Sequence, residues 1–516
     1  MKTIKYSCCL VLMLLSQVLL AQQTPDQIKF TRQAVKRIVF DKDQSIVLSS
    51  LQTENVVDLP VMHPVSNELT HPAQIAVNGH QLIVSSTEET QSAVWLGGFN
   101  PFATYSLDLA SCSGKGVVGF EFTDAEHQQK IMVFEEYTDS LITAVKLKIT
   151  KNDAVVVDKS IAVETPGKIQ HKLILQMLGS GLMLYTQNQG LPKVIGQADF
   201  NKYVDLRSKN CLNNYQTDLL VKVQNGSVKI NHADIALTAG MGLADIRPIT
   251  YEDGEPFMDQ GRLWYTMSIR GHGLPHALQG VFSLNPTVFD IKLEGIIVFD
   301  RNDGLLRNEV ASHIFYDRKD KMWRGVTTGF SAYANPEQEK KQLLIIESKH
   351  DPRFGFSVMN ARSFAMVGDM EDPQLLYDTQ AKKWRMIACK NQGGYKAILL
   401  ESDHWDGGYK QIAGPVAHNS TGTSLQRIGG KLYCFSGSSE NKIFTYTYPD
   451  LKEAGTLKMD LPPWNETSGS RVWPNVVQLP DGYPFKYIAL MMDRFNYPGI
   501  QGQNWTYGSL YLYHGY

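Results

Sequence analysis

The sequence has few cysteines and lacks the motifs by which proteins usually hold zinc. Six cysteines occur among 516 residues, and neither a CxxC nor an HExxH pattern is present. No structural or catalytic zinc is therefore indicated. Cys112 and Cys211 could pair in an oxidising compartment, whereas Cys389 and Cys434 lie in predicted strands and are typical of small buried apolar residues.

Net charge and apolar stretches of membrane-spanning length are also lacking. A net charge of −2 gives no support to a general role in binding nucleic acid or other polyanions. The apolar run from Cys8 to Leu20 has about 13 residues, short of the roughly 20 that a spanning helix needs. Because Lys2 and Lys5 precede it and Leu19-Leu-Ala21 ends it, we predict a secretory signal over residues 1–21 and export to the periplasm or the cell exterior.

Helical periodicity is scarce as well, and only residues 27–39 hint at it. Residues 22–238 instead alternate apolar and polar side chains, as in Val145-Lys-Leu-Lys-Ile-Thr, with turn residues between the runs. Such period-2 alternation predicts antiparallel strands with one buried face. We therefore predict an all-β chain whose residues 22–238 form a β-sandwich of the jelly-roll type.

A phrase that recurs five times dominates the second half. Each copy has a polar opener, a few apolar residues, a turn and an aromatic-rich strand. The copies are Asp245…Tyr265, Ser312…Trp323, Glu371…Trp384, Gly422…Tyr433 and Arg471…Tyr487. Openers spaced roughly 50–70 residues apart suit the blades of a propeller, whose first strands line a central channel. We predict a five-bladed β-propeller over residues 239–516; two stacked β-sandwiches are the alternative.

Particular stretches of both parts resemble known families. The layout of residues 22–238 resembles the concanavalin-like modules often attached to secreted carbohydrate enzymes. Gly242-Leu-Ala-Asp-Ile-Arg-Pro248 resembles the first-blade motif of the five-bladed propeller glycosidases, which include glycoside hydrolase families 43, 32, 62, 117 and 130. Met370–Asp378 resembles their third-blade motif and Ser420–Tyr433 their fourth. The resemblance covers residues 240–516.

This resemblance implies that Asp245 is the catalytic base and that Asp372 orients and tunes the site. The family's acid, a fourth-blade Glu, is missing, because Thr421-Gly422 stands where a Glu-Gly pair is expected. Hydrolysis of a glycosidic bond needs two carboxyl groups, so another proton donor is required. Glu371, His313 and His418 are the candidates, although Glu371 and Asp372 would point to opposite faces of an ideal strand.

The other candidate residues would bind substrate. Arginine binds carboxylates in a bidentate manner, and aromatic rings stack on sugars, so basic and aromatic loops suit an acidic glycan. Trp264, Trp323 and Trp384 repeat at one position and are predicted to be core. The predicted catalytic residues are Asp245, Asp372, Glu371 and His313, and the predicted substrate-binding residues are Arg471, Trp473, His418, His272 and Arg353.

Three functions fit these observations. The leading hypothesis is an exported hydrolase of O-glycosyl bonds in an acidic polysaccharide or oligosaccharide. The alternatives are a lyase on uronic-acid glycans and a non-catalytic glycan-binding protein, both favoured by the missing acid. No cofactor is predicted, although a channel cation such as calcium remains open. The absence of a phosphate loop and of a Ser-His-Asp order disfavours nucleotide and serine-hydrolase chemistry.

Overall fold

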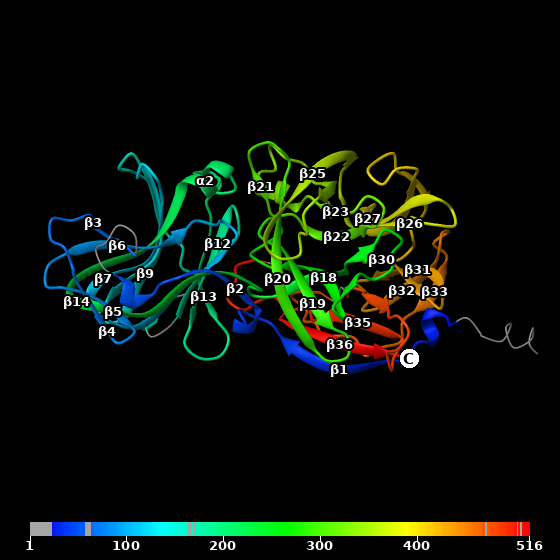
Figure 1. Ribbon diagram of the computed structural model, residues 1–516, viewed down its shortest axis with the longest axis horizontal. Helices are drawn as coiled ribbons and strands as arrows, with labels where there is room; N and C mark the ends of the chain where they lie inside the picture. Colours follow the sequence, from blue (N-terminus) through cyan, green and yellow to red (C-terminus); the bar gives the residue numbers. More distant parts are fainter. Residues whose placement is uncertain are drawn as a thin grey trace, which may run out of the picture.

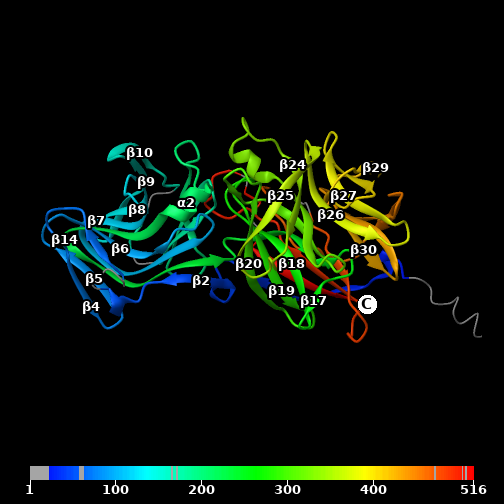
Figure 2. The same cartoon turned by 45° about the horizontal axis from the view of Figure 1, so that its top comes forward.

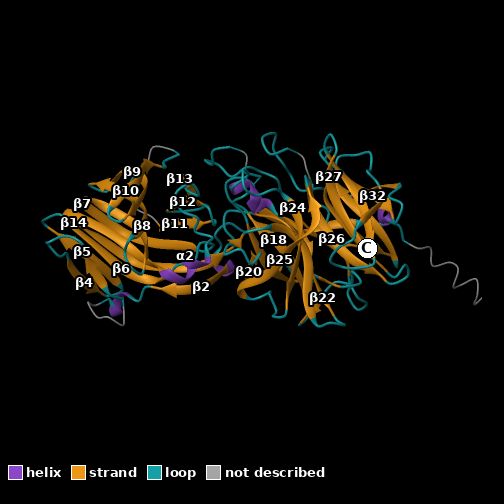
Figure 3. Ribbon diagram, turned by 90° about the horizontal axis from the view of Figure 1, so that it is seen from above, coloured by secondary structure: helices purple, strands orange, loops and turns teal. Residues whose placement is uncertain are grey.

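The computed structural model describes residues 23–56, 63–163, 167–169, 172–469, 472–502, 504–505 and 508–516. The predicted signal segment and Arg471 lie outside these ranges. The chain is all-β, as predicted, and strands fill both lobes (Figure 3). In the described ranges, no helix is long and apolar enough to cross a membrane. The short helices are α2 (Lys209–Asn214), η1 (Pro25–Gln27), η2 (Lys42–Gln44), η3 (Thr53–Asn55) and η4 (Phe330–Ala334).

The molecule has two lobes that lie side by side (Figure 1), and a 13-stranded sheet builds the N-terminal one. Its two longest strands, β7 and β14, pair antiparallel along most of their length. The first part of β7 also pairs with β11 and the second part with β8, so β7 joins both sides of the lobe. The strands are β2 (Ser45–Ser50), β3 (Val65–Asn67), β4 (Gln74–Asn78), β5 (Gln81–Ser86), β6 (Thr90–Gly98), β7 (Thr104–Asp124), β8 (Gln129–Thr138), β9 (Leu141–Lys151), β10 (Ala154–Ser160), β11 (Lys172–Met177), β12 (Gly181–Gln187), β13 (Lys193–Asp199) and β14 (Tyr215–Thr238).

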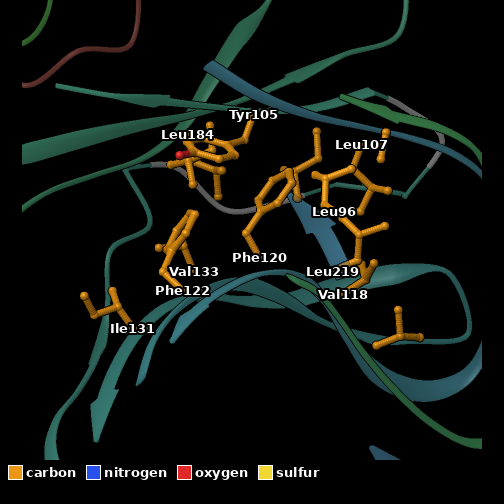
Figure 4. Packing of buried hydrophobic residues seen from close by; sticks show 14 of the residues in the cluster. Leu96, Tyr105, Leu107, Val118, Phe120, Phe122, Ile131, Val133, Leu184 and Leu219 are labelled. Atoms are coloured by element: carbon orange, nitrogen blue, oxygen red, sulfur yellow. The ribbon is translucent and has the colours of Figure 1, made fainter. Parts of the chain in front are cut away.

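One hydrophobic core fills the N-terminal lobe. Burial alternates along β9, where Val145, Leu147 and Ile149 point inward, as the sequence pattern predicts. Phe120 and Phe122 of β7 lie in the same cluster (Figure 4). Cys112 is buried in this core and Cys211 lies on α2, and both are free thiols.

The C-terminal lobe contains, within the described residues, five antiparallel units of four strands, here called units one to five. The outer strands of units one and two, β20 and β25, pair parallel and join these units into one larger sheet. Trp264 and Trp323 are buried between them, as predicted. Small strands β16 (Thr250–Tyr251), β17 (Met258–Asp259) and β21 (Leu306–Arg307) flank these two units.

The units follow each other along the chain. Unit one has β15 (Leu243–Pro248), β18 (Arg262–Ile269), β19 (Leu278–Asn285) and β20 (Asp290–Asp300); unit two has β22 (Val310–Asp317), β23 (Met322–Thr328), β24 (Gln342–Ser348) and β25 (Gly355–Val367); unit three has β26 (Met370–Asp378), β27 (Lys383–Asn391), β28 (Tyr395–Ser402) and β29 (Lys410–Ala413); unit four has β30 (Thr421–Ile428), β31 (Lys431–Gly437), β32 (Ile443–Thr447) and β33 (Glu453–Thr456); unit five has β34 (Val476–Gln478), β35 (Tyr487–Met492), β36 (Ser509–Gly515) and β1 (Phe30–Arg37).

The units are arranged as a ring. The first strand of each unit contacts the first strand of the next, from β15 to β22, β26, β30 and β34. The ring closes because β15 also contacts β35 of unit five. First strands that meet in this way bring their side chains to one centre.

The outermost strand of unit five comes from the other end of the chain, which corrects two expectations. Residues 27–39 are not helical, because β1 alternates exposed and half-buried residues and pairs antiparallel with β36. The boundary drawn at residues 22–238 also assigned this strand to the wrong lobe. Figure 1 shows β1 alongside β36 in the C-terminal lobe, and Figure 2 shows β2 leading into the other lobe. The N-terminal lobe is thus inserted between β1 and β15.

Closure by β1 predicts that its one deeply packed side chain stabilises the C-terminal lobe. Phe30 is buried in the cluster of unit five, whereas Val35 on the same strand is 49% exposed. Phe30→Ala should lower the unfolding free energy by about 3 kcal/mol, and the control Val35→Ala by less than about 0.5 kcal/mol. Denaturant unfolding followed by tryptophan fluorescence measures both. Equal midpoints for the two variants would contradict the closure.

Candidate active site

A repeated β-bulge sets the direction of the side chains at the centre of the ring. In each of units one to four, the register of the first two strands shifts by one residue. Between two consecutive pairs the first strand advances by three residues and the second by two, so the first strand contains one extra residue. That extra residue has a left-handed backbone: φ is 53° at Asp245, 57° at Ala311, 58° at Asp372 and 59° at Gly422. Such angles are uncommon outside glycine and often mark functional sites.

Because of this bulge, two consecutive residues of unit three face the same cavity. Glu371 and Asp372 both line it, together with Asp245 of unit one. The expectation that the strand would turn Glu371 away from Asp372 is therefore wrong, since it assumed an ideal strand. The cavity measures about 190 Å³ and is otherwise lined by Arg270, Leu274, Phe330, Tyr395, Thr421, Val472, Trp473, Met492, Arg494 and Trp505.

Asp245 is paired with an arginine across unit one. Its Oδ1 accepts a hydrogen bond from Nη2 of Arg270 at 3.2 Å, and both side chains are buried. Arg270 follows the end of β18, which pairs with the strand that carries Asp245.

Asp372 is the most perturbed acid of the cavity. It is 4% exposed, and its Oδ2 accepts the backbone N–H of Gly422 at 2.7 Å. Burial first, and then the neighbouring carboxylate of Glu371, raises the pKa of Asp372 to about 7, although Arg247 opposes this rise. Asp372 can therefore carry a proton near neutral pH.

Glu371 belongs to a separate ionic network on the wall of the cavity. Its Oε2 accepts from Nζ of Lys341 at 2.9 Å, and the same ammonium donates to Asp369 at 2.7 Å and to the Tyr395 hydroxyl at 2.9 Å. Burial opposes the charge on Lys341, but Glu371 and Asp369 outweigh it and raise the pKa of this lysine.

Trp473 closes the cavity beside unit four. Its Nε1 donates to the carbonyl of Ile246 at 2.6 Å, and its ring lies against Gly422. A Cβ at residue 422 would come within 2.5 Å of the indole, so glycine is required there by packing as well as by its backbone angle. Gly422, the glycine of the expected Glu-Gly pair, thus makes room for Trp473, which lines the cavity.

Two predicted histidines lie elsewhere. Two residues beyond the bulge of unit two, His313 is fully buried, and its ring nitrogens contact Thr250 and the N–H of Leu375. Burial and then Arg247 lower the pKa of His313 to about 3, so it is a neutral packing residue and not a proton donor to the cavity. His418 stacks on Phe444 at 3.8 Å and pairs with Glu440 and Glu453, away from the cavity lining.

Two predicted substrate-binding residues are structural. Arg353 pairs with Asp351 and Asp259, and its guanidinium lies over the rings of Trp264 at 4.2 Å and Phe257 at 4.8 Å. His272 stacks on His276 at 4.0 Å behind the cavity. Neither lines the cavity, and Arg471 lies outside the described residues.

Several residues of the site were missed. Arg270, which directly follows the end of β18, was not among the predicted site residues. No local sequence pattern marks four further residues of the site, because only the closed ring brings them to the centre. They are Lys341, Tyr395, Arg494 and Trp505. Within the described part of the chain, no group of His, Cys, Asp and Glu could hold a metal ion.

Comparisons with known proteins find similar structures but no matching family model and no curated protein. A GH43_1 enzyme from Xanthomonas citri is 10% identical, covers 52% of this chain and 87% of its own, and has a TM-score of 0.37. A family 117 glycoside hydrolase from Zobellia galactanivorans is also 10% identical, with coverages of 53% and 84% and a TM-score of 0.37. The carbohydrate-binding module CBM66 from Bacillus subtilis is 15% identical, with coverages of 33% and 93% and a TM-score of 0.23. The two enzymes match about half of this chain and the binding module about a third of it.

The raised pKa of Asp372 predicts a pH-dependent gain in stability on its neutralisation. A carboxyl whose folded pKa is raised contributes stability that is present in full below about pH 4 and is lost as the pH rises through about 7. Asp372→Asn should therefore raise the unfolding free energy by about 2–4 kcal/mol at pH 8 and by little at pH 4.

A matched aspartate gives the opposite sign. Hydrogen bonds from Tyr448 and from backbone N–H groups outweigh burial and lower the pKa of Asp378, so Asp378→Asn should lose stability at pH 8. Denaturant unfolding at both pH values measures the two variants. A destabilised Asp372→Asn protein at pH 8 would contradict the raised pKa.

The aromatic surroundings of Arg353 predict a loss of stability and not of binding. Arg353→Met leaves Asp351 and Asp259 without their partner and should cost about 3 kcal/mol. Arg362→Met, which removes an exposed pair with Asp406, should cost less than about 1 kcal/mol. Thermal unfolding compares them, and an Arg353→Met protein of native stability would refute a structural role.

Proposed function

We propose that the C-terminal lobe is a five-bladed β-propeller and the N-terminal lobe a β-sandwich inserted into it. Five four-stranded units whose first strands contact one another in a ring support the first assignment. A large hydrophobic core, to which the paired long strands β7 and β14 both contribute, supports the second. Export, guided by the segment at residues 1–21, belongs to the same proposal.

We infer that the protein hydrolyses glycosidic bonds, and one observation carries this inference. Three carboxyl groups from two units, Asp245, Glu371 and Asp372, line one cavity. Glycoside hydrolysis needs two carboxyl groups in different protonation states, one to protonate the leaving oxygen and one to activate water or attack. The cavity has room for roughly six water molecules at about 30 Å³ each, which suits the end of a glycan chain.

The surroundings of the acids suggest their roles. Asp245, held by Arg270, is the base or nucleophile. Asp372, whose pKa is raised to about 7, is the proton donor in place of the missing fourth-blade Glu. Its contacts with Gly422 and Thr421 both involve Oδ2, so Oδ1 can carry the proton. The neighbouring carboxylate of Glu371, paired with Lys341, contributes to the raised pKa of Asp372.

Two guanidinium groups in the cavity wall support an acidic sugar, although one of them already pairs with Asp245. Arg270 and Arg494 line the cavity wall, and guanidinium groups recognise carboxylates with two parallel hydrogen bonds. A uronate is the acidic residue that this arrangement suits. A lyase would need a base other than these carboxylates, and the pKa of the one lining phenol, Tyr395, is raised first by burial and then by Glu371. The hydrolase is therefore preferred.

Loss of either key carboxylate should abolish turnover. Asp245→Asn and Asp372→Asn should each lower kcat/KM at least 100-fold on the active glycan, because each removes one partner of the acid–base pair. Glu440→Gln, which removes an exposed partner of His418, should change it less than twofold. Release of reducing ends from a panel of uronate-containing and neutral glycans measures the rates.

The same panel separates the alternatives. An unsaturated uronate product, seen by its ultraviolet absorbance, would replace the hydrolase with a lyase. Binding without any turnover by the native protein would indicate a glycan-binding protein.

A further inference from the structure

We propose that the N-terminal lobe forms part of the active site by positioning two wall segments of the cavity, residues 270–277 and residues 494–502 with 504–505. Neither segment belongs to the N-terminal lobe, yet each is bound to it. The inference about catalysis rests on the proposed function; the inference about positioning does not.

The first segment is held at the residue that contacts Asp245. Gln176 of β11 is 1% exposed, and its Nε2 donates to the carbonyl of Arg270 at 3.3 Å. Its Oε1 accepts from the Tyr185 hydroxyl at 3.2 Å, which fixes the amide. Because the Arg270 side chain contacts Asp245 at 3.2 Å, a glutamine of the N-terminal lobe is two contacts away from the proposed base.

Two histidines fasten the rest of this segment. His276 is buried, and its Nε2 lies 3.4 Å from Asp199 of β13. His272 stacks on it at 4.0 Å, and burial followed by the charge of His276 lowers the pKa of His272 to about 3. A neutral His272 can stack on its neighbour without repulsion between charges.

The rings of both histidines lie against a glycine of the N-terminal lobe. A Cβ at Gly181, in β12, would lie 2.6 Å from Cε1 of His276 and 2.8 Å from Nε2 of His272. Real Cβ atoms do not approach that closely, so alanine at this residue must displace the histidines. Gly181 is therefore a contact that can be altered without touching the cavity.

The second segment is held by different residues of the same lobe. The Tyr497 hydroxyl donates to the carbonyl of Pro192 at 2.5 Å, and the N–H of Gln501 donates to Oε1 of Gln197 at 3.0 Å. Within the segment, the N–H of Trp505 donates to Asn496 at 3.0 Å. Trp505 and Arg494 line the cavity, so this wall too depends on the N-terminal lobe.

Gln176 and Gly181 are thus positioning residues. They touch neither the carboxylates nor the cavity, and they act through Arg270 and the two histidines. The size of the cavity and the placement of its cationic wall depend on how the two lobes dock.

The test combines amide hydrogen exchange with kinetics of the full chain. Gly181→Ala should speed exchange in residues 270–277 several-fold and lower kcat/KM at least tenfold, because small misplacements near reacting groups are costly. Gln176→Leu should act in the same direction. The control Gly196→Ala also adds a tight Cβ in this lobe, 3.2 Å from the Ile161 carbonyl. It should change neither amide exchange in residues 270–277 nor kcat/KM.

Relief of the crowding provides a second arm. Gly181→Ala combined with His276→Ala should be less impaired than the sum of the two single variants, because the added Cβ then meets one ring, that of His272, instead of two. Unchanged exchange in residues 270–277, or strict additivity, would overturn the inference. If the native protein shows no turnover, amide exchange in residues 270–277 alone tests whether the N-terminal lobe positions this segment. The missing turnover then counts against the proposed function.

Discussion

A buried guanidinium at the centre of the C-terminal lobe connects most of its units. Arg247 of unit one is 1% exposed and donates to the carbonyl of Thr423 in unit four at 2.8 Å and to that of Asp372 in unit three at 2.6 Å. It also lies 5.2 Å from the ring of Trp473. Burial lowers the pKa of this arginine despite the opposing charge of Asp372. Burying a charged guanidinium costs free energy unless its N–H groups find hydrogen-bond acceptors. The ring of units is therefore held in the arrangement that supplies these two carbonyl acceptors.

The same constraint shapes the acids around it. Three carboxyl groups in one small cavity repel one another, and each is compensated in a different way. Arg270 neutralises Asp245 and Lys341 neutralises Glu371, whereas Asp372 receives a backbone N–H and keeps a raised pKa. A protonated acid beside an ionised one is what acid–base chemistry requires. The left-handed backbone at Asp245 and Asp372 adds local strain that the ring must hold in place.

Local sequence was sufficient for part of this arrangement and insufficient for the rest. The repeated phrase located Asp245 and Asp372, because each opens a strand with a recognisable turn and polar residue. It misplaced His313, since the register of a bulge cannot be read from spacing: Ala311, not His313, is the counterpart of Asp372. Arg353 was misjudged because an arginine in a loop looks solvated until the surrounding rings are known. Lys341 and β1 depend on contacts between residues far apart in the chain, for which the sequence has no local pattern.

The insertion of one lobe into the other explains why the two can share a site. The chain leaves unit five after β1, builds the N-terminal lobe and returns to unit one, so that lobe is tethered at both ends. The two connections also bind each other, since the N–H of Phe40 donates to the carbonyl of Gly240 at 2.8 Å. Gln44 then fixes them to unit one: its amide donates to the carbonyl of Ile291 at 2.9 Å and accepts the N–H of Leu293 at 2.8 Å. A lobe joined by one flexible linker would lose orientational entropy each time it docked. Two connections already restrict the orientation of the lobe, so less entropy is lost on docking. This is the physical condition under which weak contacts, such as that of Gln176 with Arg270, can set the position of the cavity wall.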